Sequence, residues 1–161
     1  MQLSLQCPVS RLEKMARTVI IGVDNSEYSE FAFDFYTKHI LLKDDNIVLV
    51  HVSEYTSLVQ APALLTDPVV VTELIKEEEI KVKQLVDKYS EKMKKLHLGG
   101  KVKQMAGKSG EAIIAAAVEE NADLIVMGTR GMSTVRRTFI GSVSDYVLHH
   151  SKVPVLICRK K

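Results

Sequence analysis

Cysteine is scarce in this sequence of 161 residues, which has only Cys7 and Cys158, near opposite ends. That spacing fits neither a disulfide framework nor a metal site, and a reducing cytoplasm is the expected location. Long apolar runs are also missing, and none approaches the roughly 18 residues of a membrane-spanning helix, so no membrane association is expected. The formal net charge is only +2, and no general nucleic-acid-binding field is predicted.

Residues 1–16 lack the apolar core of a signal peptide, because polar and charged residues interrupt every apolar run there. We interpret them as an N-terminal extension and residues 17–161 as one domain. The composition, 46% hydrophobic and 26% charged, is that of an ordinary globular protein with a single core.

Apolar runs of strand length recur along the domain. Buried strands are predicted at 18–23, 47–52, 122–127 and 153–157, and an edge strand with several lysines at 101–106.

Segments with helical periodicity separate these runs. The first begins at Ser26 and extends to about Leu42, and the other three cover about 69–97, 111–121 and 142–150. The stripe Ile75, Val82, Leu85, Val86, Tyr89, Met93 and Leu96 is expected to face the core, as are Val118 and Leu148. Five alternations of strand and helix predict an α/β domain, an open parallel sheet with helices on both faces.

Glycine and positive charge gather in the segment from Met127 to Ser144, which follows the fourth predicted strand and contains no acidic residue. Glycine lets backbone amides approach a ligand, and the helix that opens at the end of the segment offers unpaired N–H groups and its positive dipole end. The segment predicts an anion site, with a plain exposed loop as the alternative. The residues concerned are Met127, Gly128, Arg130, Gly131, Gly141, Ser142, Val143 and Ser144.

The spacing Gly128-x2-Gly131-x9-Gly141-Ser142 after an apolar strand resembles the nucleotide-binding signature of the universal stress protein family. The likeness extends from about Arg17 to Arg159. The resemblance implies a Rossmann-like single domain of five strands in the order 3-2-1-4-5. Because all the signature glycines are present, it implies ATP as the ligand, with ADP or AMP as other adenine nucleotides.

Asp24 follows the first predicted strand, at the sheet end where ligands of open α/β sheets bind. From the residues alone, a ligand-contacting carboxylate and a helix-capping one are equally good interpretations. The resemblance implies that Asp24, with Gly22 and Val23 beside it, contacts the nucleotide, and that the backbone of Val52 pairs with adenine. No metal site made by the protein alone is predicted, although Mg²⁺ carried by ATP would lie near Asp24.

The last predicted strand, Val153–Ile157, contains Pro154, which cannot donate a ladder hydrogen bond, so an edge position is expected. An apolar edge strand needs a cover. The resemblance implies that this strand pairs with its copy in a second subunit, which predicts a homodimer.

The predicted function is that of an ATP-binding stress-response protein, regulatory or protective, with at most slow hydrolysis, because no general base or second carboxylate accompanies the glycine segment. One alternative is a nucleotide-independent adapter or holdase dimer. Another is an adenylating enzyme of the ATP pyrophosphatase type, although only Gly22 precedes Asp24 where tandem small residues are needed. Gly107-Lys108-Ser109 lacks the earlier glycine of a P-loop, so no P-loop is predicted.

Overall fold

The computed structural model describes residues 16–53, 68–130 and 140–160 of the chain. The predicted extension, residues 1–16, lies almost wholly outside them, and the division into extension and domain stays a prediction. No helix in the described ranges is both long and apolar enough to cross a membrane.

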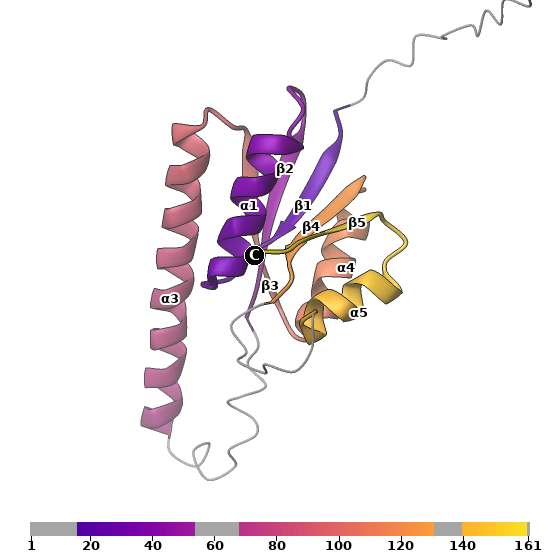
Figure 1. Cartoon of the computed structure of the whole chain (residues 1–161). Helices are drawn as coiled ribbons and strands as arrows, with labels where there is room; N and C mark the ends of the chain where they lie inside the picture. Colours follow the sequence, from indigo (N-terminus) through magenta and orange to yellow (C-terminus); the bar gives the residue numbers. More distant parts are fainter. Residues whose placement is uncertain (1–15, 54–67, 131–139, 161) are drawn as a thin grey trace, which may run out of the picture.

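Five parallel strands form one sheet in the order β3-β2-β1-β4-β5 (Figure 1). Their bounds are β1 Thr18–Gly22, β2 Asn46–Ser53, β3 Gly100–Ala106, β4 Leu124–Gly128 and β5 Val155–Cys158. The predicted α/β class and the order 3-2-1-4-5 are confirmed, and β3 and β5 are the two edges, as expected.

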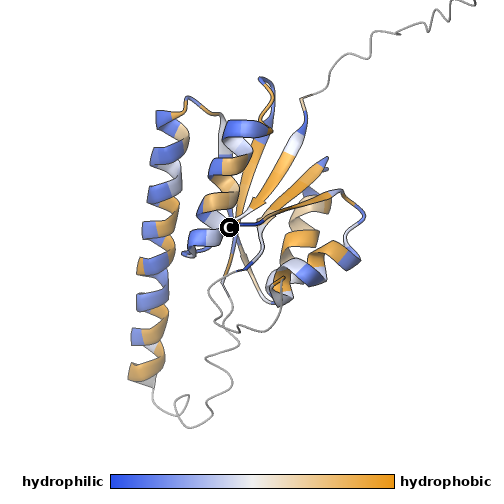
Figure 2. Ribbon diagram, in the orientation of Figure 1, coloured by the Kyte–Doolittle hydropathy of each residue, from blue (hydrophilic) through white to orange (hydrophobic). Residues whose placement is uncertain are grey.

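Helices cover both faces of this sheet, as predicted (Figure 1). α1 (Glu27–His39) and α3 (Pro68–Lys95) pack on one face, whereas α4 (Ser109–Glu119) and α5 (Ser142–His150) pack on the other. Figure 2 shows why: the central strands are hydrophobic, α4 is mostly hydrophobic, and the other helices carry both hydrophobic and hydrophilic residues. In β1, Val19 and Ile21 face α1 and α3, and Ile20 faces α4 and α5. Burial of each such side chain contributes about 1.5 to 3 kcal/mol.

Two helix ends are set by residues that the sequence singles out. Ser26 caps α1, because its Oγ accepts a hydrogen bond from the amide of Ser29 at 3.2 Å. Asn121 ends the turn after α4 in the left-handed region, at φ 49°, and the next amide donates back to Ala117 O at 2.9 Å. Asparagine tolerates this conformation better than other non-glycine residues, which confirms Asn121 as the stop.

Several predicted inward residues are exposed instead. Ile75 of α3 is 38% exposed and Leu96, just after the end of α3, is 50% exposed, and burial in this helix begins at Val82. A helix of 28 residues extends over about 42 Å, longer than the roughly 26 Å of an eight-residue strand such as β2. Val118 and Leu148 are also exposed, because Ala117 and Val147 occupy the inner faces of α4 and α5.

The fifth strand begins two residues later than predicted. Val153 and Pro154 lie in the turn before β5, where Ser151 Oγ accepts from the amide of Val153 at 3.0 Å and donates to its carbonyl at 2.9 Å. The carbonyl of Pro154 accepts from the amide of Ile125 at 2.9 Å, so the turn is already tied to β4.

Candidate functional site

A cavity of about 490 Å³, including its open mouth, lies at the carboxyl ends of β1 and β4. β1 and β4 are paired neighbours, although about a hundred residues separate them in the sequence. From β1 the chain continues outward to β2, whereas from β4 it continues to β5 on the other side. This reversal is the switch point at which open α/β sheets bind ligands.

Most of the predicted site residues line this cavity. They come from the end of β1, from β2, from β4 with its following loop, and from the start of α5: Gly22, Val23, Asp24, Val52, Met127, Gly128, Arg130, Val143 and Ser144. Gly141 and Ser142 begin α5 but do not belong to the lining. Gly131 lies outside the described residues. The binding roles of all these residues stay predictions.

Asp24 organises the turn between β1 and α1. Its Oδ1 accepts hydrogen bonds from the amide of Ser26 at 2.9 Å and from the hydroxyl of Ser26 at 2.5 Å. Asp24 is therefore not the helix cap itself; it holds the residue that is. Within the described parts of the chain, Oδ2 of Asp24 has no hydrogen-bond partner, so this turn does not use up the carboxylate.

Gly128 allows α1 to lie against the end of β4. A Cβ at this position would come within 2.6 Å of the carbonyl oxygen of Tyr28 and 2.7 Å of its carbonyl carbon. The sequence assigned Gly128 only to ligand approach, whereas the structure shows that the close neighbour is the first turn of a helix. Glycine is needed here by the fold itself.

Three hydrogen bonds tie the residues at the end of β4 and at the start of α5 to their neighbours. The amide of Thr129 donates to Cys158 O at 3.1 Å, and the amide of Gly141 donates to Thr129 O at 2.6 Å. The hydroxyl of Ser144 donates to Gly128 O at 2.8 Å. The amide of Gly141 and the hydroxyl of Ser144 were expected to face an anion. In this arrangement both donate to backbone carbonyls instead. The first amides of α5 itself have no intrahelical acceptor, so they stay available for the predicted anion.

Arg130 brings positive charge to the lining. Its guanidinium lies 5.9 Å from the centre of the Tyr28 ring, within the range of a cation–π contact. Tyr28 belongs to the first turn of α1, so the arginine is held between that helix and the cavity.

Four lining residues were missed by the sequence: Ser29, Val50, Ser109 and Ile113. Val50 lies two positions before Val52 and shares its face of β2, a period-two signal that was available. Ser109 belongs to the Gly-Lys-Ser string, which acts as the start of α4 and not as a P-loop. The neighbouring Lys108 is the N-cap, and its ammonium pairs with Glu111 at 3.3 Å.

The lining is divided by chemistry. Val50, Val52 and Ile113 offer an apolar wall, while Asp24, Arg130 and the start of α5 offer a carboxylate, a guanidinium and backbone amides. A pocket that combines an apolar wall with a few convergent polar groups suits a small ligand that is apolar at one end and anionic at the other. Asp24 is the only acid among the described lining residues.

Comparison with known proteins agrees with this fold. Universal stress protein MJ0577 of Methanocaldococcus jannaschii is 27% identical over 157 residues, covering 91% of this chain and 97% of the relative. The solved structure of MJ0577 covers 91% of this chain and 98% of its own, with a TM-score of 0.71 and 23% identity.

Two further solved structures share the fold. A universal stress protein in complex with cAMP has a TM-score of 0.66 at 22% identity, covering 90% of this chain and 98% of its own. A universal stress protein family protein of Arabidopsis thaliana with AMP bound has a TM-score of 0.64 at 17% identity, covering 90% and 92%. The model of the universal stress protein family matches residues 15–159, nearly the whole chain. The chain therefore belongs to the universal stress protein family.

Proposed function

We propose that the cavity between β1 and β4 binds an adenine nucleotide, ATP in the first place, and that the protein is a stress-response regulator or protective protein. The observation that carries the proposal is the convergence of Asp24, Arg130 and the start of α5 around one cavity with an apolar wall. The AMP and cAMP bound by relatives of the same fold support this class of ligand.

Each part of the nucleotide has a matching surface. The apolar wall takes the base, with the backbone of Val52 as its hydrogen-bonding edge. Asp24 Oδ2 accepts from a ribose hydroxyl, or lies near Mg²⁺ that arrives with the phosphates. The amides at the start of α5 and the guanidinium of Arg130 face the phosphate chain, where positive potential is worth most.

Hydrolysis is expected to be slow at most. Phosphoryl transfer requires a positioned nucleophile together with charge stabilisation. Among the described lining residues, Asp24 is the only acid that is present to help with either. The bound nucleotide then acts as a signal of state or as a structural ligand. An adenylating enzyme, in contrast, would release an acyl-adenylate when ATP and a candidate acid are supplied, which product analysis detects.

Calorimetry with ATP and AMP tests the site directly. We expect micromolar ATP affinity for the wild-type protein and a loss of about tenfold or more in Arg130→Ala, the effect of one charge-assisted hydrogen bond. AMP affinity should fall less, because Arg130 faces the outer phosphates. Lys38→Ala, which removes an exposed cation from the last turn of α1, is the matched control and should bind normally.

The same titrations separate the alternatives. Absence of heat with ATP would favour the nucleotide-independent adapter or holdase. Equal losses for ATP and AMP in Arg130→Ala would refute the outer-phosphate role while leaving the nucleotide site standing.

We propose in addition that the protein is a homodimer paired through β5. β5 is an edge strand whose residues Val155, Leu156 and Ile157 are only half-buried. The carbonyls of Pro154 and Cys158 accept hydrogen bonds from β4 and its loop, so the main-chain groups of Val155 and Ile157 face away from the sheet.

Light scattering should therefore give a mass twice the 18.0 kDa of one chain at micromolar concentration. Ile157→Pro removes an outward N–H without touching the ladder to β4, and it should shift the mass to that of one chain. A wild-type protein that is monomeric under these conditions would contradict the dimer. The cytoplasmic location expected from the cysteine usage stays a prediction.

A further inference from the structure

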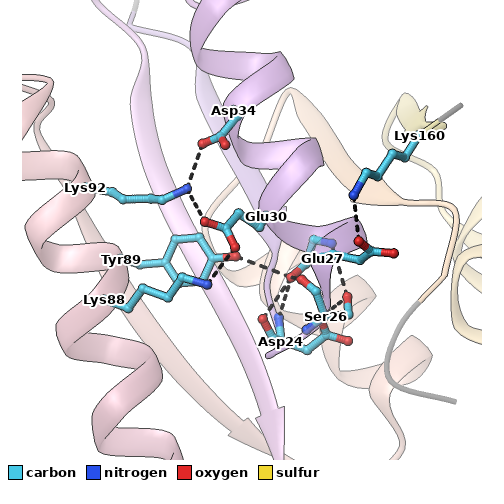
Figure 3. A network of polar contacts seen from close by, with 10 residues as sticks. Asp24, Ser26, Glu27, Glu30, Asp34, Lys88, Tyr89, Lys92 and Lys160 are labelled. Carbon is cyan, nitrogen blue, oxygen red and sulfur yellow. Dashed lines mark hydrogen bonds and ion pairs between the residues drawn. The ribbon is translucent and has the colours of Figure 1, made fainter.

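α1 and α3 are joined at their surface by ion pairs (Figure 3). Glu30 binds the ammonium groups of Lys88 and Lys92, each at 2.7 Å, and Lys92 also reaches Asp34 at 2.9 Å. These side chains are partly exposed, so each pair contributes little energy. They connect the surfaces of α1 and α3.

Tyr89 lies beneath these pairs, only 1% exposed. Its ring meets that of Phe33 edge-on, with centroids 5.4 Å apart. Its hydroxyl is aimed from α3 toward the turn that carries Asp24 and Ser26 (Figure 3), and it lies 3.3 Å from the Oγ of Ser29. Burial raises the pKa of Tyr89 to about 12, so the group is an intact O–H at neutral pH.

Ser29 connects this hydroxyl to the cavity. It is 4% exposed, lines the cavity, and accepts from the amide of Asp24 at 3.2 Å. Its own proton goes to Asp24 O at 2.8 Å, with Ser26 O at 3.1 Å as a second acceptor. A serine hydroxyl has one proton and two lone pairs, so when the proton of Ser29 goes to Asp24 O, Tyr89 is the donor to Ser29. The Ser29 hydroxyl thus bonds both the amide and the carbonyl of Asp24, and Tyr89 in turn contacts that hydroxyl.

We propose that Ser29 and Tyr89 are positioning residues for the nucleotide site, and that through them nucleotide binding is coupled to the packing of α3 against α1. This inference rests on the proposed function. A nucleotide that contacts the Asp24 turn binds best when the turn is held still, and by linkage it must strengthen the contact that holds it. α3 thereby becomes the element through which occupancy is transmitted to the surface.

Tyr89→Phe tests the coupling, because it removes the hydroxyl and keeps the packed ring. We expect ATP and AMP affinity to fall by roughly threefold to tenfold, the effect of one hydrogen bond. Tyr36→Phe is the matched control. Tyr36 is equally buried in the same core cluster, but its hydroxyl donates to Asp45 at 2.5 Å, outside the cavity. It should lower stability and leave affinity unchanged.

A mutant cycle with Ser29→Ala distinguishes coupling from general loosening. Once Ser29 Oγ is gone, Tyr89→Phe should cause no further loss of affinity, whereas in the wild-type background it does. Hydrogen exchange gives an independent measure. ATP should slow exchange of the α3 amides around Tyr89 in the wild type and in Tyr36→Phe, and not in Tyr89→Phe.

The outcomes are distinct. Normal nucleotide binding by Tyr89→Phe, or full additivity with Ser29→Ala, overturns the positioning role and leaves the proposed function intact. No heat from either nucleotide with the wild-type protein overturns both. Equal losses in Tyr36→Phe and Tyr89→Phe would show a general effect of core stability and would also overturn the inference.

Discussion

Gly128→Ala is expected to lower the free energy of unfolding by about 3 kcal/mol, at the upper end of what overpacking costs. The new methyl group would meet the carbonyl carbon and oxygen of Tyr28 at 2.7 and 2.6 Å. These atoms belong to the backbone of α1, so no side-chain rotation can relieve the contact. The helix must move off β4, and the Asp24 turn that leads into the helix must move with it.

Gly22→Ala is the matched control at the end of the neighbouring strand. Its Cβ would lie 3.5 Å from Ile113 and 3.6 Å from Met127, ordinary van der Waals distances to flexible side chains. We expect a change in stability below about 1 kcal/mol. Urea unfolding of the two variants measures the contrast. Equal stabilities would mean that α1 is not held against β4 as the structure has it.

The sheet could be predicted from the sequence because its signals are local. Continuous apolar runs mark β1, β2 and β4, and Asn121 marks the stop after α4. The order of the strands came from the family resemblance carried by the glycine spacing, since no local pattern states which strand lies beside which. That order also placed Asp24 and Gly128 at one crevice, where the structure has them.

The remaining features depend on contacts between distant segments. Nothing near Gly128 in the sequence indicates that Tyr28 lies against it, and nothing near Ser29 indicates Tyr89, which is 60 residues away. Helical periodicity gives the inner face of α3, but it cannot say where the sheet beneath ends, so Ile75 was misplaced. The amide of Gly141 likewise lies at the predicted anion site, but it donates its hydrogen bond to the carbonyl of Thr129 instead.

The loop between α1 and β2 is held by one buried carboxylate. Asp45, whose side chain is 1% exposed, accepts from Arg17 Nε at 3.0 Å and Nη2 at 2.6 Å, from the Tyr36 hydroxyl at 2.5 Å and from the Leu42 amide at 2.9 Å. The sequence shows an Asp-Asp-Asn helix breaker here. The structure shows that the second aspartate joins Arg17, the residue before β1, to α1 and to the loop.

Asp45→Asn is therefore expected to lower the free energy of unfolding by about 3 kcal/mol, the lower end for breaking a buried pair, since Arg17 is partly exposed. The amide removes the charge opposite Arg17 and cannot accept all four donors. Asp44→Asn, one residue earlier and exposed, is the matched control and should change stability by less than about 0.5 kcal/mol. Two variants of equal stability would contradict the role of the carboxylate.

Acid titration adds a second test of Asp45. Burial acts to raise the pKa of this carboxyl, but the hydrogen bonds from Arg17, the Leu42 amide and Tyr36 outweigh it, and the pKa lies below its ordinary value. A depressed folded pKa means that the carboxylate contributes stability above the unfolded value of about 3.9 and loses it as pH falls through the folded pKa. Urea unfolding should show wild-type stability falling steeply below about pH 4. Asp45→Asn should show a shallower fall, because the amide does not titrate; parallel pH curves for the two proteins would mean that other carboxyl groups carry the acid sensitivity.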